Sequence, residues 1–376
     1  MTRRALTGAA IFDGDSLRQS HALLLEGDIC AGIVAASDIP DGFEAQDMQG
    51  VTLLPGFVDL QVNGGGGVMF NDDTSADGLA AIAAAHATTG TRALLPTLIT
   101  DTPDRTRAAI DAAEAAIERR VPGIIGLHLE GPHLSVARKG AHDPDLIRPM
   151  TVADEALLAE AAQRLPNLMV TVAPENVTAD QIARLAEAGV IVSLGHTDCG
   201  IDVARAAFAA GAACVTHLFN AMSQLGSREP GLVGAALTTP GVSAGLIADG
   251  IHVHAATIRA ALDAKHAEGR IFLVTDAMST VGSDITEFTL NGRRVLRRDG
   301  RLTLENGTLA GADLEFCTAL RVLTEDVGVP QATAFAMATD WPARLLRHRG
   351  GTGRFQPGEA AHAIRLDPAG RYLGAA

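Results

Sequence analysis

Hydrophobic and polar positions follow a regular order along most of the chain, with short apolar runs between longer alanine-rich runs. From about residue 51, eight apolar runs lie at 51–62, 91–99, 123–130, 168–175, 190–196, 213–219, 242–249 and 271–277. Predicted helices lie between most of them, at 75–90, 105–120, 152–165 and 178–189. Strands that alternate with helices indicate a parallel sheet, and eight such strands predict an α/β fold of the (β/α)8 TIM-like barrel type. A doubly wound sheet is the alternative that this pattern leaves open.

The two ends of the chain have a different pattern. Residues 1–52 alternate in polarity and turn at Asp-Gly and Glu-Gly-Asp, which is typical of hairpins. The tail, residues 350–376, also has the pattern of short strands and turns. We therefore expect both ends to form one small β-sandwich domain beside a barrel domain of residues 53–349. Within the barrel domain, residues 231–243 and 286–311 are predicted to be loop or hairpin insertions.

The composition is that of a folded chain, and its charge limits the kinds of partner. Of the 376 residues, 47% are hydrophobic and 20% are charged, which allows a sizeable core and argues against disorder. The formal net charge of −14 argues against a nucleic-acid partner, which would require a basic face. An anionic substrate would need a local cationic pocket within an acidic molecule.

The cysteines and the apolar runs indicate the compartment. Four cysteines are scattered without a Cys-x-x-Cys pair, so neither a disulfide framework nor a cysteine-built zinc site is expected. The first residues contain too short an apolar run for a signal peptide, and no run reaches the ~20 residues of a membrane span. We therefore predict a soluble cytoplasmic protein without a membrane partner.

Polar residues gather at the carboxyl ends of the predicted strands. In a barrel these ends form the catalytic face, whereas polar residues that only satisfy the core would be scattered. The residues at these ends are Gln61, Asn63, Glu130, His196, His217, Asp249 and Asp276. The pattern therefore predicts an active site to which several strands contribute.

Three of these residues have the chemistry of a metal site. Glu130 ends one strand, and His196 and His217 end two later, consecutive strands. Each alone could be structural, the glutamate in an ion pair and each histidine in a hydrogen bond. Together, two imidazoles and a carboxylate that leave one position for water are the pattern of catalytic zinc. We predict one divalent metal ion per subunit, zinc first, with iron, cobalt and manganese as alternatives.

The first strand ends in a pair that differs from that of many metal-dependent barrels. Barrel hydrolases that bind two metals often carry His-x-His there, whereas this chain has Gln61 and Asn63. Neutral amides are poor zinc ligands but good hydrogen-bonding groups. We therefore predict that both amides bind substrate, with metal or water as other contacts, and that the chain has one metal site in place of two.

Asp276 ends the eighth run and is the predicted acid/base residue. A carboxylate at this position can take a proton from water and pass it to a leaving group. The metal would lower the pKa of the water towards ~7 and polarise a carbonyl. The structural alternative is an acid that caps the next helix.

Five further residues could bind substrate around this centre. A histidine can stabilise a developing oxyanion, and an arginine together with backbone amides suits a phosphate. By residue type alone, each of the five could equally be structural or exposed: His142, Asn220, Ala221, Arg228 and His252.

Seven segments at the strand ends carry a resemblance to a known family. They read PGFVDLQVNGGGGVMFND, GLHLEGPHLSVARKGAHDP, TVAPE, SLGHTD, THLFNAMSQLGSREPGLVGAAL, IADGIHVH and LVTDAM, in this order from about residue 50 to 340. Together they closely resemble the N-acetylglucosamine-6-phosphate deacetylases, a branch of the amidohydrolase superfamily. The resemblance implies a metal-dependent barrel with a β-sandwich made from both termini, and a homodimer. The implied reaction converts N-acetyl-D-glucosamine 6-phosphate to D-glucosamine 6-phosphate and acetate.

For catalysis, the resemblance assigns a role to each matching residue. Glu130, His196 and His217 would be the metal ligands, and Asp276 would be the acid/base. His142 in the KGAH segment would polarise the acetyl carbonyl.

For binding of the amino sugar phosphate, the resemblance implies a site shared between subunits. The amides of Asn220 and Ala221 would hold the phosphate together with His252. Arg228 would reach from one subunit into the site of its neighbour. The Gln-x-Asn pair on the first strand resembles the members of the family that bind a single metal.

Two other functions stay open at this point. The nearer one is an amidohydrolase that acts on a different N-acyl amino sugar phosphate or on another amide, which removal of the phosphate from the substrate would distinguish. The other is a catalytically silent sugar-phosphate sensor with the same fold, against which the intact ligand set and Asp276 argue.

Overall fold

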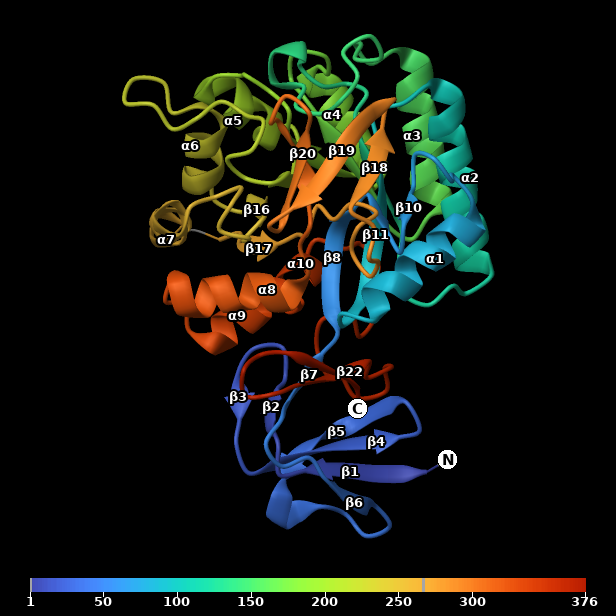
Figure 1. Cartoon of the computed structure of the whole chain (residues 1–376), viewed down its shortest axis with the longest axis vertical. Coiled ribbons are helices and arrows are strands. Elements are labelled where there is room, and N and C mark those ends of the chain that lie inside the picture. Colours follow the sequence, from blue (N-terminus) through green and yellow to red (C-terminus); the bar gives the residue numbers. More distant parts are fainter. Residues whose placement is uncertain (1, 266–267) are drawn as a thin grey trace.

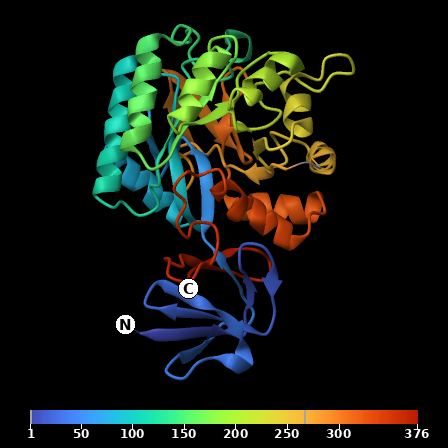
Figure 2. The ribbon, with the colours of Figure 1, turned by 180° about the vertical axis from the view of Figure 1, so that it is seen from behind.

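The larger of the two parts of the molecule is built around one eight-stranded sheet (Figure 1). The computed structural model describes residues 2–265 and 268–376. The sheet consists of β8 (Phe57–Val62), β11 (Thr91–Ile99), β12 (Leu127–Glu130), β13 (Leu168–Val172), β14 (Ile191–Leu194), β15 (Cys214–Val215), β16 (Ser243–Leu246) and β17 (Ile271–Leu273). All neighbouring strands are parallel, their order follows the chain, and helices cover the outside (Figure 2). The predicted barrel is confirmed, and the doubly wound alternative is wrong because such a sheet reverses its strand order.

The barrel closes where its first and last strands approach each other. The Asp276 N–H donates to the Gln61 carbonyl at 3.0 Å, and the Asn63 N–H donates to the Ala277 carbonyl at 2.8 Å. A single parallel bridge joins Val62 to Ala277. This seam therefore lies at the carboxyl ends of the strands, at the level of the predicted site residues.

The helices of the barrel begin at side chains that cap their first turns. Ser75, Thr102, Thr151 and Thr178 each accept a hydrogen bond from the backbone N–H three residues later. These caps satisfy N–H groups that a helix leaves without a partner, and the four predicted helices begin within a few residues of them. The helices are α1 (Ala76–Ala87), α2 (Pro103–Glu118), α3 (Val152–Arg164), α4 (Ala179–Glu187), α5 (Ile201–Ala209), α6 (Gly231–Thr238), α7 (Ala255–Ala264), α8 (Phe316–Arg321), α9 (Gln331–Ala338) and α10 (Asp340–Ala343).

The loop or hairpin predicted at residues 231–243 is wrong, because most of this segment is helix α6. All seven residues from Gly231 to Leu237 are buried. A helix is recognised in a sequence by apolar and polar residues that recur with a period of 3.6 residues. A helix that is apolar on every side has no polar face and therefore lacks this period. The pattern of this segment therefore did not indicate a helix.

The second predicted insertion is confirmed as an antiparallel hairpin sheet. Its strands are β18 (Glu287–Leu290), β19 (Arg293–Arg298), β20 (Arg301–Leu304) and β21 (Leu309–Ala312). The turns at residues 291–292 and 299–300 have positive φ, as two-residue hairpin turns require. Apolar residues of this sheet pack on Met69, Ile99 and Met278. Since Ile99 is the last residue of β11, the insertion lies over the carboxyl ends of the barrel strands.

The smaller part of the molecule is a sandwich of two sheets that contains both termini (Figure 1). One sheet has the order β5-β4-β1-β6 and the other has the order β23-β22-β7-β2-β3. Leu6, Leu23, Leu53, Phe355 and Ala363 are among the buried residues that join the sheets. The strands are β1 (Arg3–Thr7), β2 (Ala10–Phe12), β3 (Leu17–Arg18), β4 (His21–Glu26), β5 (Ile29–Ala35), β6 (Glu44–Asp47), β7 (Thr52–Pro55), β22 (Ala363–Leu366) and β23 (Tyr372–Ala375). The predicted sandwich of both termini is therefore confirmed.

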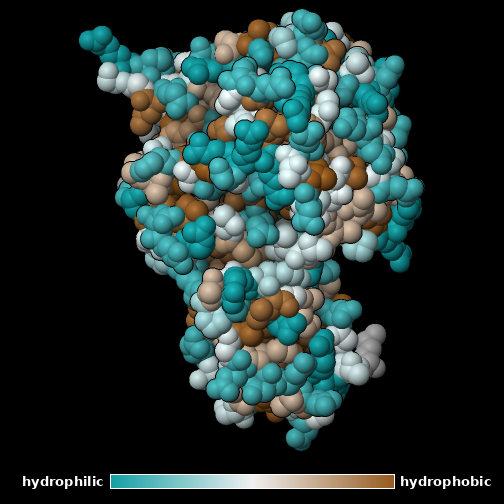
Figure 3. All heavy atoms as spheres, viewed as in Figure 1, coloured by the Kyte–Doolittle hydropathy of each residue, from teal (hydrophilic) through white to brown (hydrophobic). Residues whose placement is uncertain are grey.

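The surface in Figure 3 is mostly hydrophilic, with hydrophobic residues in small separate groups. The loop that precedes α6 extends away from the barrel in the ribbon and in the space-filling view (Figures 1 and 3). Within the described part of the chain, no helix has both the length and the apolar character needed to span a bilayer.

Asp340 is expected to contribute strongly to stability. Its fully buried carboxylate lies 2.5 Å from Arg344 Nε, 3.1 Å from Arg354 Nε and 3.6 Å from Arg349 Nη1. Replacement by alanine leaves three guanidinium groups without their shared anion, so the free energy of unfolding in urea should fall by about 3–5 kcal/mol. The control is Asp104→Ala, because the side chain of Asp104 is 94% exposed in its ion pair and its loss should change stability by less than about 1 kcal/mol. Equal losses in the two variants would contradict this expectation.

His86 on α1 is expected to make stability depend on pH. Its ring is 1% exposed, its Nε2 lies 2.9 Å from the Gly64 carbonyl, and burial lowers its pKa. Since the pKa is about 6.5 in the unfolded chain, this contribution is complete above that pH and is lost as the pH falls towards the folded pKa. We expect the free energy of unfolding to fall by up to about 1.4 kcal/mol per pH unit below about pH 6.5 because of this group. In His86→Gln the pH dependence should be weaker, and an unchanged dependence would rule out this origin.

Candidate active site

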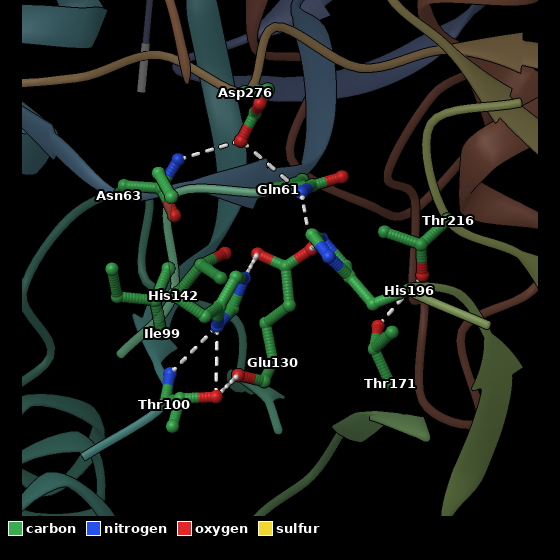
Figure 4. Close-up of polar contacts among 12 residues, drawn as sticks. Gln61, Asn63, Ile99, Thr100, Glu130, His142, Thr171, His196, Thr216 and Asp276 are labelled. Atoms are coloured by element: carbon green, nitrogen blue, oxygen red, sulfur yellow. Dashed lines mark hydrogen bonds and ion pairs between the residues drawn. The ribbon is translucent and has the colours of Figure 1, made fainter. Parts of the chain in front are cut away.

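The predicted site residues converge on one pocket at the carboxyl ends of the barrel strands. Its volume is about 410 Å³, a size typical of small-molecule sites. Nine of the predicted residues line it: Asn63, Glu130, His142, His196, His217, Asn220, Ala221, His252 and Asp276. Gln61 is buried behind this lining, and Arg228 lies outside it. Figure 4 shows Gln61 between Asp276 and Glu130.

Glu130, His196 and His217 form a triangle of potential ligand atoms. Glu130 Oε1 lies 3.2 Å from His196 Nε2 and 3.1 Å from His217 Nε2, and the two nitrogens are 3.1 Å apart. Two ligands of a tetrahedral zinc ion at its usual bond lengths are roughly 3.3 Å apart. All three side chains are buried. The triangle therefore has the size and the donor chemistry to hold one divalent ion.

The hydrogen bonds of the imidazoles indicate which of them can bind a metal. His196 Nδ1 lies 2.8 Å from the Arg138 carbonyl, so Nδ1 donates and Nε2 keeps a free lone pair. His142 Nδ1 faces Thr100, whose backbone nitrogen lies 3.3 Å away and whose Oγ1 lies 2.8 Å away. Glu130, His142 and His196 also bring ligand atoms within 4.8 Å of one another. His217 Nε2 lies 3.1 Å from both Glu130 Oε1 and His196 Nε2, whereas His142 Nε2 lies 3.9 Å from Glu130 Oε2, and these distances favour His217 as the third ligand.

The electrostatics of the triangle fit a bound cation. Burial alone would raise the pKa of Glu130, but hydrogen bonds from His196 and His217 outweigh it and hold the pKa well below its usual range. For His217, burial alone would lower the pKa, but Glu130 raises it. Two imidazole lone pairs beside a carboxylate repel one another unless a positive charge lies among them. A divalent ion held by the three groups would supply this charge.

Gln61 and Asn63 hold the second carboxylate of the site. Gln61 Nε2 donates to Glu130 Oε1 at 3.2 Å and to Asp276 Oδ1 at 3.1 Å, and Asn63 Nδ2 donates to the same Asp276 oxygen at 2.7 Å (Figure 4). Burial raises the pKa of Asp276, and the charge of Glu130 raises it further. The two amides therefore contact carboxylates, and Asn63 alone of the pair lines the pocket.

Three strand-end residues of the site, like Ala221 in the loop after His217, have a backbone conformation that side-chain-bearing residues seldom adopt. The φ angles are +48° at His196, +28° at His217 and +52° at Asp276. Such left-handed residues are strained and persist only where the surroundings fix them. Their occurrence at three strand ends is typical of a functional site, because the turn directs each side chain over the mouth of the barrel.

A buried hydrogen-bond network lies one layer below the ligands. His128 Nε2 is 2.7 Å from Thr171 Oγ1, Thr171 Oγ1 is 2.6 Å from Thr216 Oγ1, and Thr216 Oγ1 is 2.6 Å from Ser193 Oγ. Burial lowers the pKa of His128 to about 4, so this ring is neutral near pH 7. The network links β12, β13, β14 and the end of β15, and so fixes the strands that carry the triangle. Figure 4 shows its contact between Thr171 and Thr216.

His252, Asn220 and Ala221 line a part of the pocket that offers hydrogen-bond donors. Asp249 holds His252, because its Oδ2 lies 2.6 Å from His252 Nδ1 and its Oδ1 accepts the His252 N–H at 2.7 Å. The Asn220 N–H already donates to the His217 carbonyl at 2.9 Å. The Ala221 N–H has no acceptor among the described residues. The backbone N–H of Ala221 is therefore available to bind an anion, whereas the N–H of Asn220 is already used.

Arg228 is not brought to the pocket of its own chain. It is exposed in the loop between Met222 and α6, and this loop extends away from the barrel (Figure 1). In this arrangement Arg228 does not contribute to the pocket of its own chain.

The sequence did not indicate one wall of the pocket. This wall comes from the hairpin insertion and consists of Leu290, Thr308, Leu309 and Gly311. The available signal was topological: the insertion follows Asp276, and every segment that leaves the carboxyl end of a barrel strand faces the catalytic side. The Arg138 carbonyl was also missed, because a backbone partner of a histidine has no signature in the sequence.

Comparison with known proteins places the chain in a family. Residues 52–373 match the Amidohydrolase family, and residues 4–53 match the NagA composite domain. The chain therefore belongs to the amidohydrolase family, a class of barrel hydrolases, as the resemblance predicted.

Three proteins similar to this chain bear the name of a particular activity. The chain is 44% identical over 322 residues to the N-acetylgalactosamine-6-phosphate deacetylase of Shewanella sp. (strain ANA-3), covering 86% of this chain and 81% of the relative. The crystal structure of N-acetylglucosamine-6-phosphate deacetylase from Pasteurella multocida has a TM-score of 0.94 and 34% identity, covering 100% of this chain and 98% of that chain. A mutant of N-acetyl-D-glucosamine-6-phosphate deacetylase from Mycobacterium smegmatis, in complex with N-acetyl-D-glucosamine-6-phosphate, has a TM-score of 0.90 and 30% identity, covering 99% and 97%.

Proposed function

We propose that this protein hydrolyses the N-acetyl group of N-acetyl-D-glucosamine 6-phosphate to give D-glucosamine 6-phosphate and acetate. The observation that carries the proposal is the triangle of Glu130, His196 and His217, linked through Gln61 to Asp276, in one pocket of an amidohydrolase barrel. The similar structures that bear the name of this activity support the same substrate.

Glu130, His196 and His217 would hold one divalent ion, for which we propose zinc because two imidazoles and a carboxylate are a common catalytic zinc set. When bound, the ion would polarise the acetyl carbonyl and lower the pKa of a water molecule. A second ion would need the lone pairs of Asp276 Oδ1, to which Gln61 and Asn63 donate N–H groups. This arrangement supports a single metal per subunit.

Asp276 would move the proton of the reaction. Burial raises its pKa, which brings the carboxyl closer to the working pH of a general acid and base. As a carboxylate it would take a proton from the attacking water. As an acid it would then give this proton to the amine nitrogen while the C–N bond breaks.

His142 would bind the acetyl oxygen. Burial lowers its pKa to about 3, so the ring is neutral near pH 7. In the tautomer that we propose, Nδ1 accepts from the Thr100 N–H, and the Nε2–H donates to the oxygen as negative charge develops there.

For the phosphate, we propose the Ala221 N–H, Asn220 and His252 of one subunit together with Arg228 of a second copy in a homodimer. The exposed position of Arg228 supports this sharing, since the residue does not line its own pocket. A guanidinium group suits a phosphate because it can form two parallel hydrogen bonds.

A subunit-mixing experiment tests the shared site. Arg228→Ala and Asp276→Asn should each be almost inactive on the phosphorylated sugar. When the two are unfolded together and refolded in equal amounts, about a quarter of the wild-type activity should return, because each mixed dimer has one intact site. No recovery with dimers formed would place Arg228 in its own subunit's site or outside any site.

The galactosamine epimer is a second candidate substrate. The relative that is 44% identical is named for N-acetylgalactosamine 6-phosphate. Acetate release from both epimers, each with and without its phosphate, tests the proposal. Faster release from the phosphorylated glucosamine compound supports it, faster release from the galactosamine compound replaces it, and equal release without phosphate contradicts both.

We also propose that the enzyme acts in the cytoplasm. All four cysteines are free, and Cys30, Cys199 and Cys214 are buried. Free thiols persist in a reducing compartment, which supports this location.

A further inference from the structure

The carboxyl group of Asp59 has no role in the mechanism above, although it lies directly below the site. It is fully buried, and neither Asp59 nor Thr275 lines the pocket. Asp59 Oδ2 accepts the Thr275 hydroxyl at 2.5 Å, while its Oδ1 accepts the N–H groups of Thr275 and Gln61, each at 3.2 Å. A buried carboxyl is unfavourable unless such hydrogen bonds compensate for the lost water. Its contacts therefore indicate what it does.

Thr275 fixes the backbone on both sides of Asp276. Its hydroxyl accepts the Ala277 N–H at 3.2 Å, so one side chain joins residue 275 to residue 277 across Asp276. The Asp276 N–H donates to Gln61, and its carbonyl accepts the Ala312 N–H at 2.9 Å. Asp276 has a φ of +52°, a conformation that must be held by its surroundings. The hydrogen bonds of the Thr275 hydroxyl to Asp59 and to the Ala277 N–H supply this restraint.

Asp59 acts at the seam of the barrel. β8 and β17 share no strand ladder, and the bridge between Val62 and Ala277 is isolated. Through its two oxygens, Asp59 connects the backbone of Gln61 on β8 to Thr275 beyond the end of β17. The same two segments carry the side chains of Gln61 and Asp276, which form a hydrogen bond of 3.1 Å. The carboxyl group thus sets the relative position of a donor and an acceptor of the active site.

We propose that Asp59 and Thr275 are positioning residues, which lock the left-handed backbone of Asp276 and direct its carboxylate towards Gln61, Asn63 and the reacting atoms. This inference rests on the acid/base role given to Asp276 under the proposed function. It makes the seam of the barrel a part of the catalytic apparatus, although neither residue touches the substrate.

The test compares Thr275→Val, which removes the hydroxyl at nearly constant shape, with Thr275→Ser, which keeps it. In Thr275→Val, kcat should fall by about 10- to 100-fold with KM within about threefold, because a small misplacement of a catalytic group is enough for such a loss. The acidic limb of the pH–rate profile should also move. Thr275→Ser should restore kcat to within about threefold and return the limb to its original place.

The matched control is Thr339→Val, since Thr339 is equally buried and its hydroxyl donates to the Phe335 carbonyl at 2.7 Å. It should keep the kcat and the pH profile of the wild type. An unchanged kcat and pH profile in Thr275→Val would overturn the inference, and so would a loss that serine does not repair. If Thr275→Val does not fold, Asp59→Asn is measured in its place, with a change in the same direction expected and an unchanged profile contradicting the inference.

A crystal structure separates this inference from the proposed function. If the wild-type protein releases no acetate, the proposed function fails while the positioning can still be seen directly. The structure of Thr275→Val should show Asp276 Oδ1 displaced from Asn63 Nδ2, which lies 2.7 Å away in the wild type. An Asp276 carboxylate that keeps its place in the variant would overturn the inference whatever the reaction is.

Discussion

Asp276→Asn is expected to lower kcat by about 10²–10⁴-fold, while the protein keeps its metal and binds its substrate. Asparagine has the shape of aspartate, but its amide can neither take a proton from water nor deliver one to the amine. Its Oδ1 can still accept from Gln61 and Asn63, which donate to this oxygen at 3.1 and 2.7 Å in the wild type. Acetate release under saturating substrate, with metal content measured by atomic emission, checks both parts of this expectation.

The control for this variant is Asp13→Asn in the small domain. The side chain of Asp13 is 16% exposed and forms an ion pair with Arg18 at 2.6 Å. The change therefore removes a carboxylate of similar burial at a distance from the pocket, and kcat should stay as in the wild type. An Asp276→Asn enzyme within tenfold of the wild-type kcat would contradict the acid/base role. Full biological effect with normal ligand binding and no catalysis would revive the sensor as the function.

His196→Ala is expected to release the metal. The change removes one of three ligand atoms that lie 3.1–3.2 Å apart, and it leaves Glu130 and His217 as the rest of the set. Loss of an outer partner of a ligand typically weakens metal binding 10- to 100-fold, so loss of a ligand itself should weaken it by at least about 100-fold. Purified protein should contain far less than about one metal per chain, and activity should fall with the metal content.

Two further variants serve as controls for the metal loss in His196→Ala. His21→Ala removes a histidine of the small domain whose Nδ1 contacts the Gln19 carbonyl, and it should keep metal and activity. His142→Ala should keep the metal and lose activity, because we propose that His142 binds the acetyl oxygen and its Nε2 lies 3.9 Å from Glu130 Oε2, farther than the ligand atoms lie from one another. If His142→Ala lost the metal and His217→Ala kept it, the third metal ligand would be His142 and not His217.

The architecture could be predicted because it depends on periodicity, which the sequence displays directly. The alternation of apolar strands with alanine-rich helical runs predicted the barrel, and the structure shows serine and threonine caps at the starts of four of the helices. The prediction failed at α6, which is buried on all sides and therefore lacks the contrast between faces. The same physical limit would hide any helix in the centre of a large domain.

The site residues that could be predicted from the sequence are those at the carboxyl ends of the predicted strands. Glu130, His196, His217 and Asp276 were all expected there, and the structure brings them into one pocket. Their metal-binding and proton-transfer roles stay proposals that the variants above test. The contact of His142 Nδ1 with Thr100 could not be predicted, because it joins segments that are far apart in the chain.

Gln61 and Asn63 show what a sequence leaves undecided. Their residue types argued for hydrogen bonds over metal binding, but whether substrate, water or protein receives them depends on geometry. The structure places their N–H groups on Asp276 Oδ1, with Gln61 reaching Glu130 as well. Asn63 Oδ1 is buried and has no hydrogen-bond partner among the described residues. Contact of Asn63 with a substrate therefore stays a prediction.

The most direct test of the account is acetate release from N-acetyl-D-glucosamine 6-phosphate and from the unphosphorylated sugar, on protein of measured metal content. The account predicts release from the phosphorylated sugar at least about 100-fold faster in kcat/KM, since loss of a charged phosphate contact costs several kcal/mol, with about one metal per chain. Absence of release from either sugar by the metal-loaded protein would contradict the proposed reaction. Two metals per chain in an active enzyme would contradict the single site that Gln61 and Asn63 indicate.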